Sequence, residues 1–265
     1  MFVLRNFRIS AVILAFVVLS VLAIGGVFMA FWSNLFRDAS KKPSAPSCVD
    51  DPFIAARRQM VEEQLRGRDI TDPTVLEVMG RVGRHRFVPA ENQGQAYEDH
   101  PLPIGLDQTI SQPYIVALMT QLARPTPECR ALEVGVGSGY QTAILAELCN
   151  EVHGIEILQP LADAARRRLT ALGYENVTLR CGDGYQGWPE HAPFDVILVT
   201  AAPDHVPQKL VEQLAPGGRL VIPVGNFYQE LILIEKQADG TVRRKSIAGV
   251  AFVPMTGEAQ TGERK

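Results

Sequence analysis

The second half of the chain alternates short apolar runs with amphipathic stretches, and this alternation constrains the fold most strongly. Strands that alternate with helical patterns of about 10–15 residues are typical of βαβ units, whose strands lie parallel in one sheet. We therefore expect an α/β, Rossmann-like, doubly wound fold with a mainly parallel sheet. The last two apolar runs follow each other without a helix, so we expect one of them to be antiparallel. The expected strands are 131–135, 152–157, 177–181, 194–200, 219–224, 230–235 and 246–252, and the expected helices between them are 140–148, 161–172 and 206–214.

The residues before this alternation show a different pattern. Helical spacing covers 53–66, 73–82 and 114–122, and prolines punctuate a loop-rich stretch, 84–113. We expect one catalytic domain, 53–257, with an N-terminal helical part that contributes to the substrate site and a sheet part that binds the cofactor. The divisions are 53–122 for the helical part, 130–257 for the sheet part and 258–265 for a polar tail.

The N-terminus carries a long apolar segment. Residues 9–32 contain no charged side chain, and a helix of this length rises about 36 Å against roughly 30 Å of bilayer hydrocarbon. A basic N-terminus, 1–8, precedes the segment, and a linker, 33–52, follows it. We favour a retained membrane anchor; the alternative is a signal peptide cleaved near the small residues at 23–25. The nearly balanced basic flanks do not set the orientation.

Composition excludes some classes of function. A net charge of −3 and a pI near 6.0 give no electrostatic basis for nucleic-acid binding. The four cysteines contain no C-x-x-C pair, so we expect no metal site. The five histidines suggest no competing catalytic site and are expected to be structural or exposed; they are His85, His100, His153, His191 and His205.

A glycine-rich loop is the strongest local signal. The sequence Gly135-Val136-Gly137-Ser138-Gly139 follows an expected strand and opens an expected helix. Glycines let the backbone turn tightly and approach a ligand closely, with the helix N-terminus behind them. Taken alone, this pattern fits a structural turn about as well as a binding site.

Two acidic positions favour the binding site. Glu156 ends the next strand, where a carboxylate can accept hydrogen bonds from ribose hydroxyls, and Asp183, between two glycines, ends the third strand. The glycine spacing also differs from the G-x-G-x-x-G of dinucleotide binders, which suits a cofactor without phosphates. These features indicate S-adenosyl-L-methionine, although each acid is also explained as an exposed strand-end residue.

A series of motifs goes beyond this general pattern and covers 57–257. In chain order they are MVEEQL (60–65), RHRFVP (84–89), PLPIG (101–105), QTISQPY (108–114), LEVGVGSGYQ (132–141), GDG (182–184), GGRLVIPVG (217–225) and FVPMTG (252–257). The series closely resembles the protein-L-isoaspartate (D-aspartate) O-methyltransferase family.

The resemblance implies a function in protein repair. Members of that family transfer a methyl group from S-adenosylmethionine to the free α-carboxylate of isoaspartyl residues in damaged proteins, and the ester then cyclises to a succinimide. A carboxylate is ionised at neutral pH, so its methylation needs alignment rather than a strong general base.

The resemblance also implies the site residues. Ser111 and Thr109 match the catalytic loop. The cofactor positions are Glu133, Gly135, Gly137, Ser138, Gly139, Glu156, Asp183 and Gly184. The substrate positions are Ile110, Gln112, Val253 and Pro254. A hydroxyl such as that of Ser111 can orient the attacking oxygen without losing its proton.

Several residues depart from the family pattern. Leu106-Asp107 stands where members usually carry His-Gly or His-Asn, Val136 replaces a threonine, and Ile157 replaces an arginine. Asp107 adds negative charge near a site for a carboxylate. Two other hypotheses therefore stay open: methylation of a different carboxylate or small acceptor, and a membrane-tethered module that only binds the cofactor.

The expected partners are damaged proteins and peptides, with no nucleic acid, and we expect a monomer. Because the methyl donor is made in the cytosol, we expect the catalytic domain to face the cytoplasm, tethered to the membrane by 9–32; export after signal cleavage is the alternative.

Overall fold

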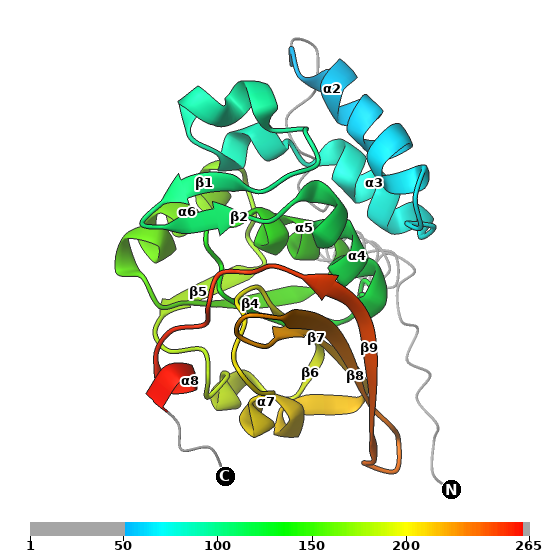
Figure 1. The fold of residues 1–265 in the computed structure, drawn as a ribbon, viewed down its shortest axis with the longest axis vertical. Coiled ribbons are helices and arrows are strands. Elements are labelled where there is room, and N and C mark those ends of the chain that lie inside the picture. Colours follow the sequence, from blue (N-terminus) through cyan, green and yellow to red (C-terminus); the bar gives the residue numbers. More distant parts are fainter. Residues whose placement is uncertain (1–50, 262–265) are drawn as a thin grey trace, which may run out of the picture. The chain divides into compact units, whose positions relative to one another are not determined.

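The computed structural model describes residues 51–261, and seven of their strands form one sheet in the order β5-β4-β3-β6-β7-β8-β9 (Figure 1). Strand β8 runs antiparallel to both of its neighbours, whereas all other neighbouring pairs are parallel. The expected fold class is thus confirmed, as is the expectation that one of the last two strands, here β8, is antiparallel. The strands are β3 (Arg130–Val134), β4 (Glu151–Glu156), β5 (Val177–Cys181), β6 (Phe194–Val199), β7 (Leu214–Val224), β8 (Gln229–Lys236) and β9 (Val242–Val250).

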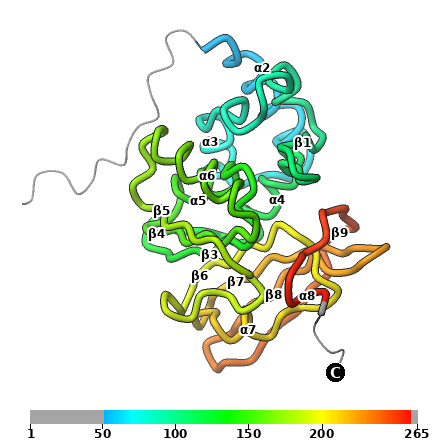
Figure 2. Tube along the Cα trace, turned by 90° about the vertical axis from the view of Figure 1, so that its left-hand side faces the viewer, coloured from blue at the N-terminus to red at the C-terminus, as the bar shows by residue number. Residues whose placement is uncertain are grey.

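Helices connect the parallel strands and cover both faces of the sheet. Helices α4 (Pro113–Ala123), α5 (Tyr140–Leu148) and α6 (Gln159–Ala171) lie on one face, and α7 (Gln208–Glu212) lies on the other (Figure 2). The chain runs outward from β3 through β4 to β5, then returns to β6 on the other side of β3. Such a reversal of strand order opens a crevice at the carboxyl ends of the strands, where ligands bind in sheets of this type.

The pleat of the strands divides the apolar residues between two cores. Ala131 and Leu198 belong to the core under α4 and α5, whereas Leu132 and Ile197 belong to the core on the side of α7. All four side chains are fully buried. A parallel sheet covered on both faces has apolar residues at consecutive positions rather than at alternate ones, which explains the continuous apolar runs of the sequence.

Two strands begin earlier than the sequence predicts. Strand β7 starts at Leu214, because Leu214 pairs with Phe194 of β6. The Pro-Gly-Gly sequence that follows lies in a bulge, and regular pairing resumes at Arg219. Strand β9 starts at Val242 and ends at Val250, so its first half is polar and exposed. Charged residues on an edge strand protect it from pairing with other chains, and their polarity hides the strand from a search for apolar runs.

The helical part before the sheet is largely as expected. Helices α2 (Ile54–Gln59) and η1 (Met60–Arg66) replace the single helix expected over 53–66, the second being a wider, π-type helix. Helix α3 (Pro73–Arg81) is capped at its N-terminus by Asp72, whose carboxylate accepts hydrogen bonds from two backbone amides of the first turn.

The stretch 84–113 is more ordered than expected. It contains two short 3-10 helices, η2 (Arg84–Phe87) and η3 (Ala90–Gln95), followed by an antiparallel hairpin of β1 (Leu102–Gly105) and β2 (Gln108–Ile110). Strands this short carry too few residues for a period of two to appear in the sequence.

The ends of the chain complete the comparison. The polar tail expected from 258 begins with a short helix, α8 (Glu258–Thr261). The basic N-terminus 1–8, the apolar segment 9–32 and nearly all of the linker 33–52 lie outside the described residues. Within 51–261, no helix is long and apolar enough to cross a membrane.

Candidate functional site

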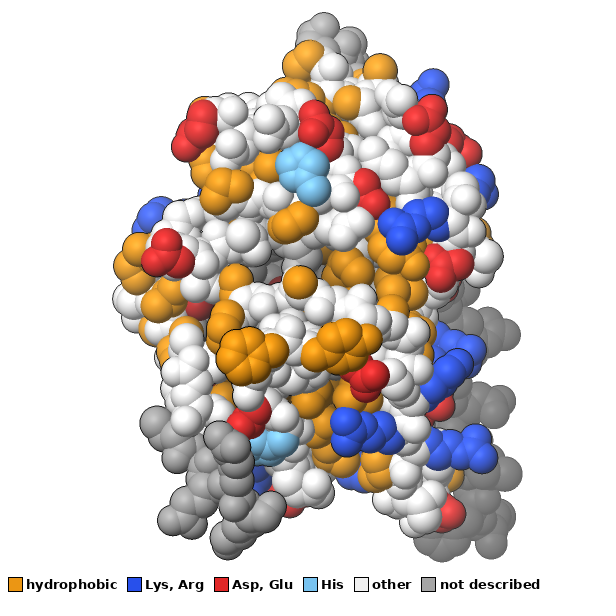
Figure 3. Space-filling model, in the orientation of Figure 1, with side chains coloured by type: hydrophobic (Ala, Val, Ile, Leu, Met, Phe, Trp, Pro, Cys, Tyr) orange, Lys and Arg blue, Asp and Glu red, His pale blue; other side chains and the backbone are white. Residues whose placement is uncertain are grey.

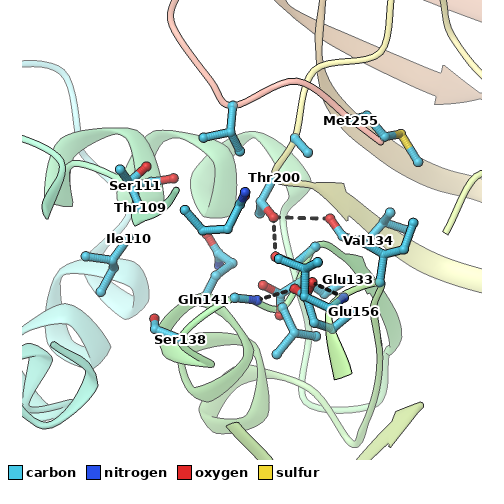
Figure 4. Close-up of a pocket in the computed structure, with 18 of the residues that line it drawn as sticks. Thr109, Ile110, Ser111, Glu133, Val134, Ser138, Gln141, Glu156, Thr200 and Met255 are labelled. Atoms are coloured by element: carbon cyan, nitrogen blue, oxygen red, sulfur yellow. Dashed lines mark hydrogen bonds between the residues drawn. The ribbon is translucent and has the colours of Figure 1, made fainter. Parts of the chain in front are cut away.

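A cavity of about 260 Å³ opens at the carboxyl ends of β3, β4 and β6. Its floor is the glycine loop after β3, one wall is the β1–β2 hairpin, and the opposite wall is the segment after β9 (Figure 4). The expected residues that line it are Thr109, Ile110, Ser111, Glu133, Gly135, Gly137, Ser138, Glu156, Gly184, Val253 and Pro254. Residues more than a hundred positions apart in the chain therefore meet in one cavity.

The glycine loop has a backbone that only glycine adopts readily. Gly135, Gly137 and Gly139 have φ values of 93°, 52° and 86°. The hydroxyl of Thr200 donates hydrogen bonds to the carbonyls of Val134, at 3.1 Å, and Gly135. A Cβ added at Gly135 would lie 2.6 Å from that hydroxyl, so any other residue would displace the loop.

Glu156 holds the rim of this loop. It is 5% exposed, and its carboxylate accepts hydrogen bonds from the amide of Gly137 at 2.7 Å and from the amide of Leu158 at 3.0 Å. Each oxygen of a carboxylate accepts more than one hydrogen bond. The side chain can therefore order the loop and still bind ligand hydroxyls.

Glu133 lies beneath the loop and is fully buried. One carboxyl oxygen accepts a hydrogen bond from the Thr142 hydroxyl at 2.5 Å, and the other, Oε1, has no partner among the described residues. Burial raises the pKa of Glu133 to about 8, and the nearby charge of Glu156 contributes to the rise. A buried polar atom that lines a cavity without a partner is a candidate for contact with a ligand.

The proposed catalytic loop follows β2. Ser111 and Thr109 lie close together and face the cavity, whereas Ile110 points away from them (Figure 4). Ile110 is also 4% exposed and belongs to the core under α4, so it anchors the loop. The alternation of strand side chains brings the two hydroxyls to the same side.

The opposite wall is held by backbone hydrogen bonds. The Ala202 amide donates to the Val253 carbonyl at 2.9 Å, and the Met255 amide donates to the Ala202 carbonyl at 2.8 Å. These bonds fix Val253 and Pro254 at the cavity beside the loop that follows β6.

Three expected site residues do not line the cavity. Gly139 is the last residue of the glycine loop and faces Ala165 and Leu169 of α6. The Gln112 side chain donates a hydrogen bond to Asp99 at 2.7 Å. Asp183 accepts hydrogen bonds from the amides of Tyr185 and Glu258, at 2.9 and 2.7 Å. Asp183 thus ties the C-terminal segment to the end of β5, next to the cavity-lining Gly184.

Sequence reasoning missed other lining residues. Thr200 and Ala201 directly follow β6, so their place at the carboxyl edge of the sheet is itself a signal. Met119, Gln141 and Met255 also line the cavity; Gln141 and Met255 lie within the quoted motifs, whereas no local pattern marks Met119 on α4.

The departures from the family pattern also lie at this site. Leu106 and Asp107 form the tip of the hairpin, with φ values of 54° and 58°, and both line the cavity. Glycine and asparagine favour positive φ, and aspartate tolerates it better than most residues. Ile157 and Val136 both line the cavity; Ile157 is 37% exposed, whereas Val136 is buried.

Three side chains that the sequence reading treated as unrelated lie together at the other end of the sheet. The rings of His153 and His191 stack at 4.1 Å, and the Nε2 atom of His153 lies 2.9 Å from Glu151. This is the one group within 51–261 with a composition and spacing that suit a metal ion. The guanidinium of Arg130 forms an ion pair with Glu151 at 2.9 Å, which balances the negative charge of that carboxylate.

The charges of the cavity indicate the kind of cofactor. The carboxylates of Asp107 and Glu156 line it, together with Glu133, which is mainly protonated at neutral pH because of its raised pKa, and the lining contains no Lys, Arg or His. Such a lining suits a cofactor that carries a cationic sulfonium and no phosphate. The sheet, the glycine loop and the acid at the end of the second strand define a Rossmann-like, S-adenosylmethionine-dependent methyltransferase.

The comparisons with known proteins specify the family. The family model for protein-L-isoaspartate(D-aspartate) O-methyltransferase matches residues 55–260. The chain is 55% identical over 224 residues to protein-L-isoaspartate O-methyltransferase 2 of Syntrophobacter fumaroxidans, covering 80% of this chain and 91% of that one. It is 53% identical over 240 residues to protein-L-isoaspartate O-methyltransferase of Synechococcus sp. (strain JA-2-3B'a(2-13)), covering 85% of this chain and 98% of that one. The chain therefore belongs to the protein-L-isoaspartate (D-aspartate) O-methyltransferase family.

Solved structures agree with this assignment. A protein-L-isoaspartate O-methyltransferase superposes with a TM-score of 0.71 at 29% identity, covering 77% of this chain and 67% of that one. A Plasmodium falciparum structure described under the same activity, in complex with S-adenosyl-L-homocysteine, superposes with a TM-score of 0.67 at 27% identity, covering 76% and 98%. This chain is an enzyme, a methyltransferase with S-adenosylmethionine as its cofactor.

Proposed function

We propose that the chain methylates the free α-carboxylate of L-isoaspartyl or D-aspartyl residues in damaged proteins, which starts their repair through a succinimide. Family membership over residues 55–260 supports this substrate class. The observation that carries the proposal is the placement of the Ser111 and Thr109 hydroxyls on the wall of a cavity whose floor is the glycine loop. Methylation of a different acceptor and a purely binding role have no comparable support.

We propose that Ser111 and Thr109 orient the substrate. When bound, S-adenosylmethionine would supply an electrophilic methyl group on a positively charged sulfur; the methyl carbon–sulfur bond would break as the oxygen–carbon bond forms, with S-adenosyl-L-homocysteine as the leaving group. The hydroxyl of Ser111 donates a hydrogen bond to one carboxylate oxygen and leaves the other directed along the axis of transfer. Because the carboxylate is already ionised, the chain needs to hold and align it rather than remove a proton.

The cofactor residues have separate proposed roles. Glu156 binds the ribose hydroxyls with the lone pairs that its bonds to Gly137 and Leu158 leave. Gly135 to Gly139 let the cofactor approach the backbone and the N-terminus of α5. Glu133 would contact the cofactor through its otherwise unpartnered Oε1 atom, and Asp183 holds Gly184 and the C-terminal wall in place.

Three of the proposed substrate residues lie on the two walls, and the fourth, Gln112, supports the hairpin wall from outside the cavity. Ile110 and Gln112 fix the hairpin side, and Val253 and Pro254 bind the substrate backbone on the other. Asp107 at the hairpin tip repels the substrate carboxylate. Replacing Asp107 with Asn should therefore lower the KM for an acidic isoaspartyl peptide a few-fold at low salt, and the difference should shrink at high salt.

The test uses the full chain, labelled S-adenosylmethionine and two peptides that differ only in an aspartyl or isoaspartyl linkage. We expect base-labile label on the isoaspartyl peptide alone. Ser111→Ala should lower kcat by about tenfold to a hundredfold while the KM for the cofactor stays the same. Ser246→Ala on the exposed strand β9 is the matched control. Cofactor binding without transfer to the isoaspartyl peptide would refute the proposed substrate.

We also propose that the catalytic domain works in the cytoplasm, where its methyl donor is made, and that residues 9–32 tether it there. Fractionation of cells should recover full-length chain with membranes and a chain lacking residues 1–50 in the soluble fraction. A processed chain recovered outside the cytoplasm would contradict this compartment and favour a cleaved signal.

A further inference from the structure

The turn between β7 and β8 exposes two aromatic side chains. Phe227 is fully exposed, at 108% of its reference area, and Tyr228 is 76% exposed. They are the most exposed large hydrophobic residues within 51–261. Neighbouring apolar side chains held in water mark a surface that binds another molecule more often than isolated ones do.

The backbone of this turn is tightly constrained. Gly225 has a φ of 130°, and a Cβ at this position would lie 2.0 Å from the carbonyl oxygen of Tyr228. The Gly225 amide donates a hydrogen bond to the Pro203 carbonyl at 2.9 Å. The backbone that carries the two rings is therefore held in a defined place, which reduces the entropic cost of binding a ligand.

The turn lies at the same edge of the sheet as the cavity. Strand β7 is parallel to β6, so its carboxyl end lies at the same edge of the sheet as the cavity. The Gln229 side chain donates to the Phe252 carbonyl at 3.1 Å and accepts from the Phe252 amide at 2.6 Å. Phe252 immediately precedes Val253, which lines the cavity. The aromatic turn is thus joined to the substrate wall by two side-chain hydrogen bonds.

Apolar groups also lie on the cavity side of this surface. Leu106 is 53% exposed and Ile157 is 37% exposed, and both line the cavity. In the view of Figure 3, hydrophobic side chains gather across the middle of the face, and Lys and Arg side chains lie mainly along its right-hand side. A chain that leaves the cavity past Val253 therefore meets exposed apolar groups as well as the carboxylate of Asp107.

We propose that Phe227 and Tyr228 form a subsite for an apolar or aromatic side chain of the substrate that flanks the isoaspartyl residue. The inference rests on the proposed function, since an acceptor within a polypeptide must continue out of the cavity in both directions. Damaged proteins that have lost local structure expose apolar residues, and such residues fit two exposed rings better than charged ones do. The subsite makes this enzyme select unfolded segments.

The experiment compares two isoaspartyl peptides that differ only in their flanking residues, one with Leu and Phe and one with Ser. In the full chain, the double variant Phe227→Ser, Tyr228→Ser should raise the KM for the apolar peptide roughly tenfold, with kcat unchanged, and should change the KM for the Ser peptide less than twofold. Phe227→Leu should retain most of the preference because it keeps an apolar side chain.

Val242→Ser is the matched control. Val242 is 46% exposed and pairs with Lys236 at the opposite edge of the sheet, so its loss should change neither KM. Equal losses for both peptides, no loss for either, or the same effect from Val242→Ser would overturn the subsite. These results differ from a failure of the proposed function, in which the unaltered chain would methylate neither peptide.

Discussion

The buried carboxyl group of Glu133 makes stability depend on pH in a way that can be calculated. Burial raises its pKa from an ordinary 4.5 to about 8. The folded protein therefore holds a proton over a pH range in which the unfolded chain has released it. Because the folded state binds more protons, the free energy of unfolding decreases as the pH rises from 4.5 to 8.

The size of the effect follows from the two pKa values. Each tenfold change in proton affinity corresponds to about 1.4 kcal/mol, so the whole range amounts to about 5 kcal/mol. Of this, about 3 kcal/mol falls between pH 5.5 and pH 8. Glu133→Gln keeps the shape of the side chain and an oxygen that accepts the hydrogen bond from Thr142, but glutamine does not titrate. This variant should therefore lose the part of the pH dependence of stability that Glu133 causes.

The assay is urea unfolding of the unaltered chain and of Glu133→Gln at several pH values. As the pH rises from 5.5 to 8, the free energy of unfolding of the variant should increase by about 3 kcal/mol relative to that of the unaltered chain. Subtracting the two curves removes the contribution of all other titrating groups. Glu128→Gln, on an exposed side chain, controls for the loss of one negative charge. A difference between the two chains that stays constant with pH would refute the raised pKa.

Three further substitutions test the packing, two of them at the cavity and one in the N-terminal helical part. The Cβ atom of Gly184→Ala would lie 2.3 Å from Cγ1 of Val134. We therefore expect the free energy of unfolding in urea to decrease by about 1–3 kcal/mol and the cofactor affinity measured by calorimetry to decrease. An unchanged affinity would show that the cavity wall moves to accommodate the methyl group. Thr200→Val removes two hydrogen bonds to the glycine loop and should raise the KM for the cofactor about fivefold to tenfold at constant kcat, whereas a change in kcat alone would contradict this role. Arg57→Met removes a buried guanidinium that bonds to Asp51 at 2.8 Å and should lower the free energy of unfolding by about 2–4 kcal/mol; a loss below 1 kcal/mol would contradict it.

Much of the cofactor site could be predicted because its residues follow strands directly. The carboxyl ends of parallel strands meet at one edge, so Gly135, Glu156 and Gly184 had to lie near one another once the strands were identified. The same reasoning extends to Thr200, which the sequence reading overlooked. The histidine stack at the other end of the sheet was missed because His153 and His191 come from separate elements whose packing no local pattern encodes.

The sequence by itself determined the fold class, the order of the elements and the family, because periodicity, glycine spacing and motifs are local properties of the chain. Only the tertiary structure decided which walls enclose the cavity, that Asp183 faces the C-terminal segment and that Glu133 is buried without a second partner. It also joined the turn that carries Phe227 and Tyr228 to the segment before Val253, through the hydrogen bonds between Gln229 and Phe252. These features depend on contacts between residues far apart in the chain, and such contacts arise when the two cores pack against the sheet.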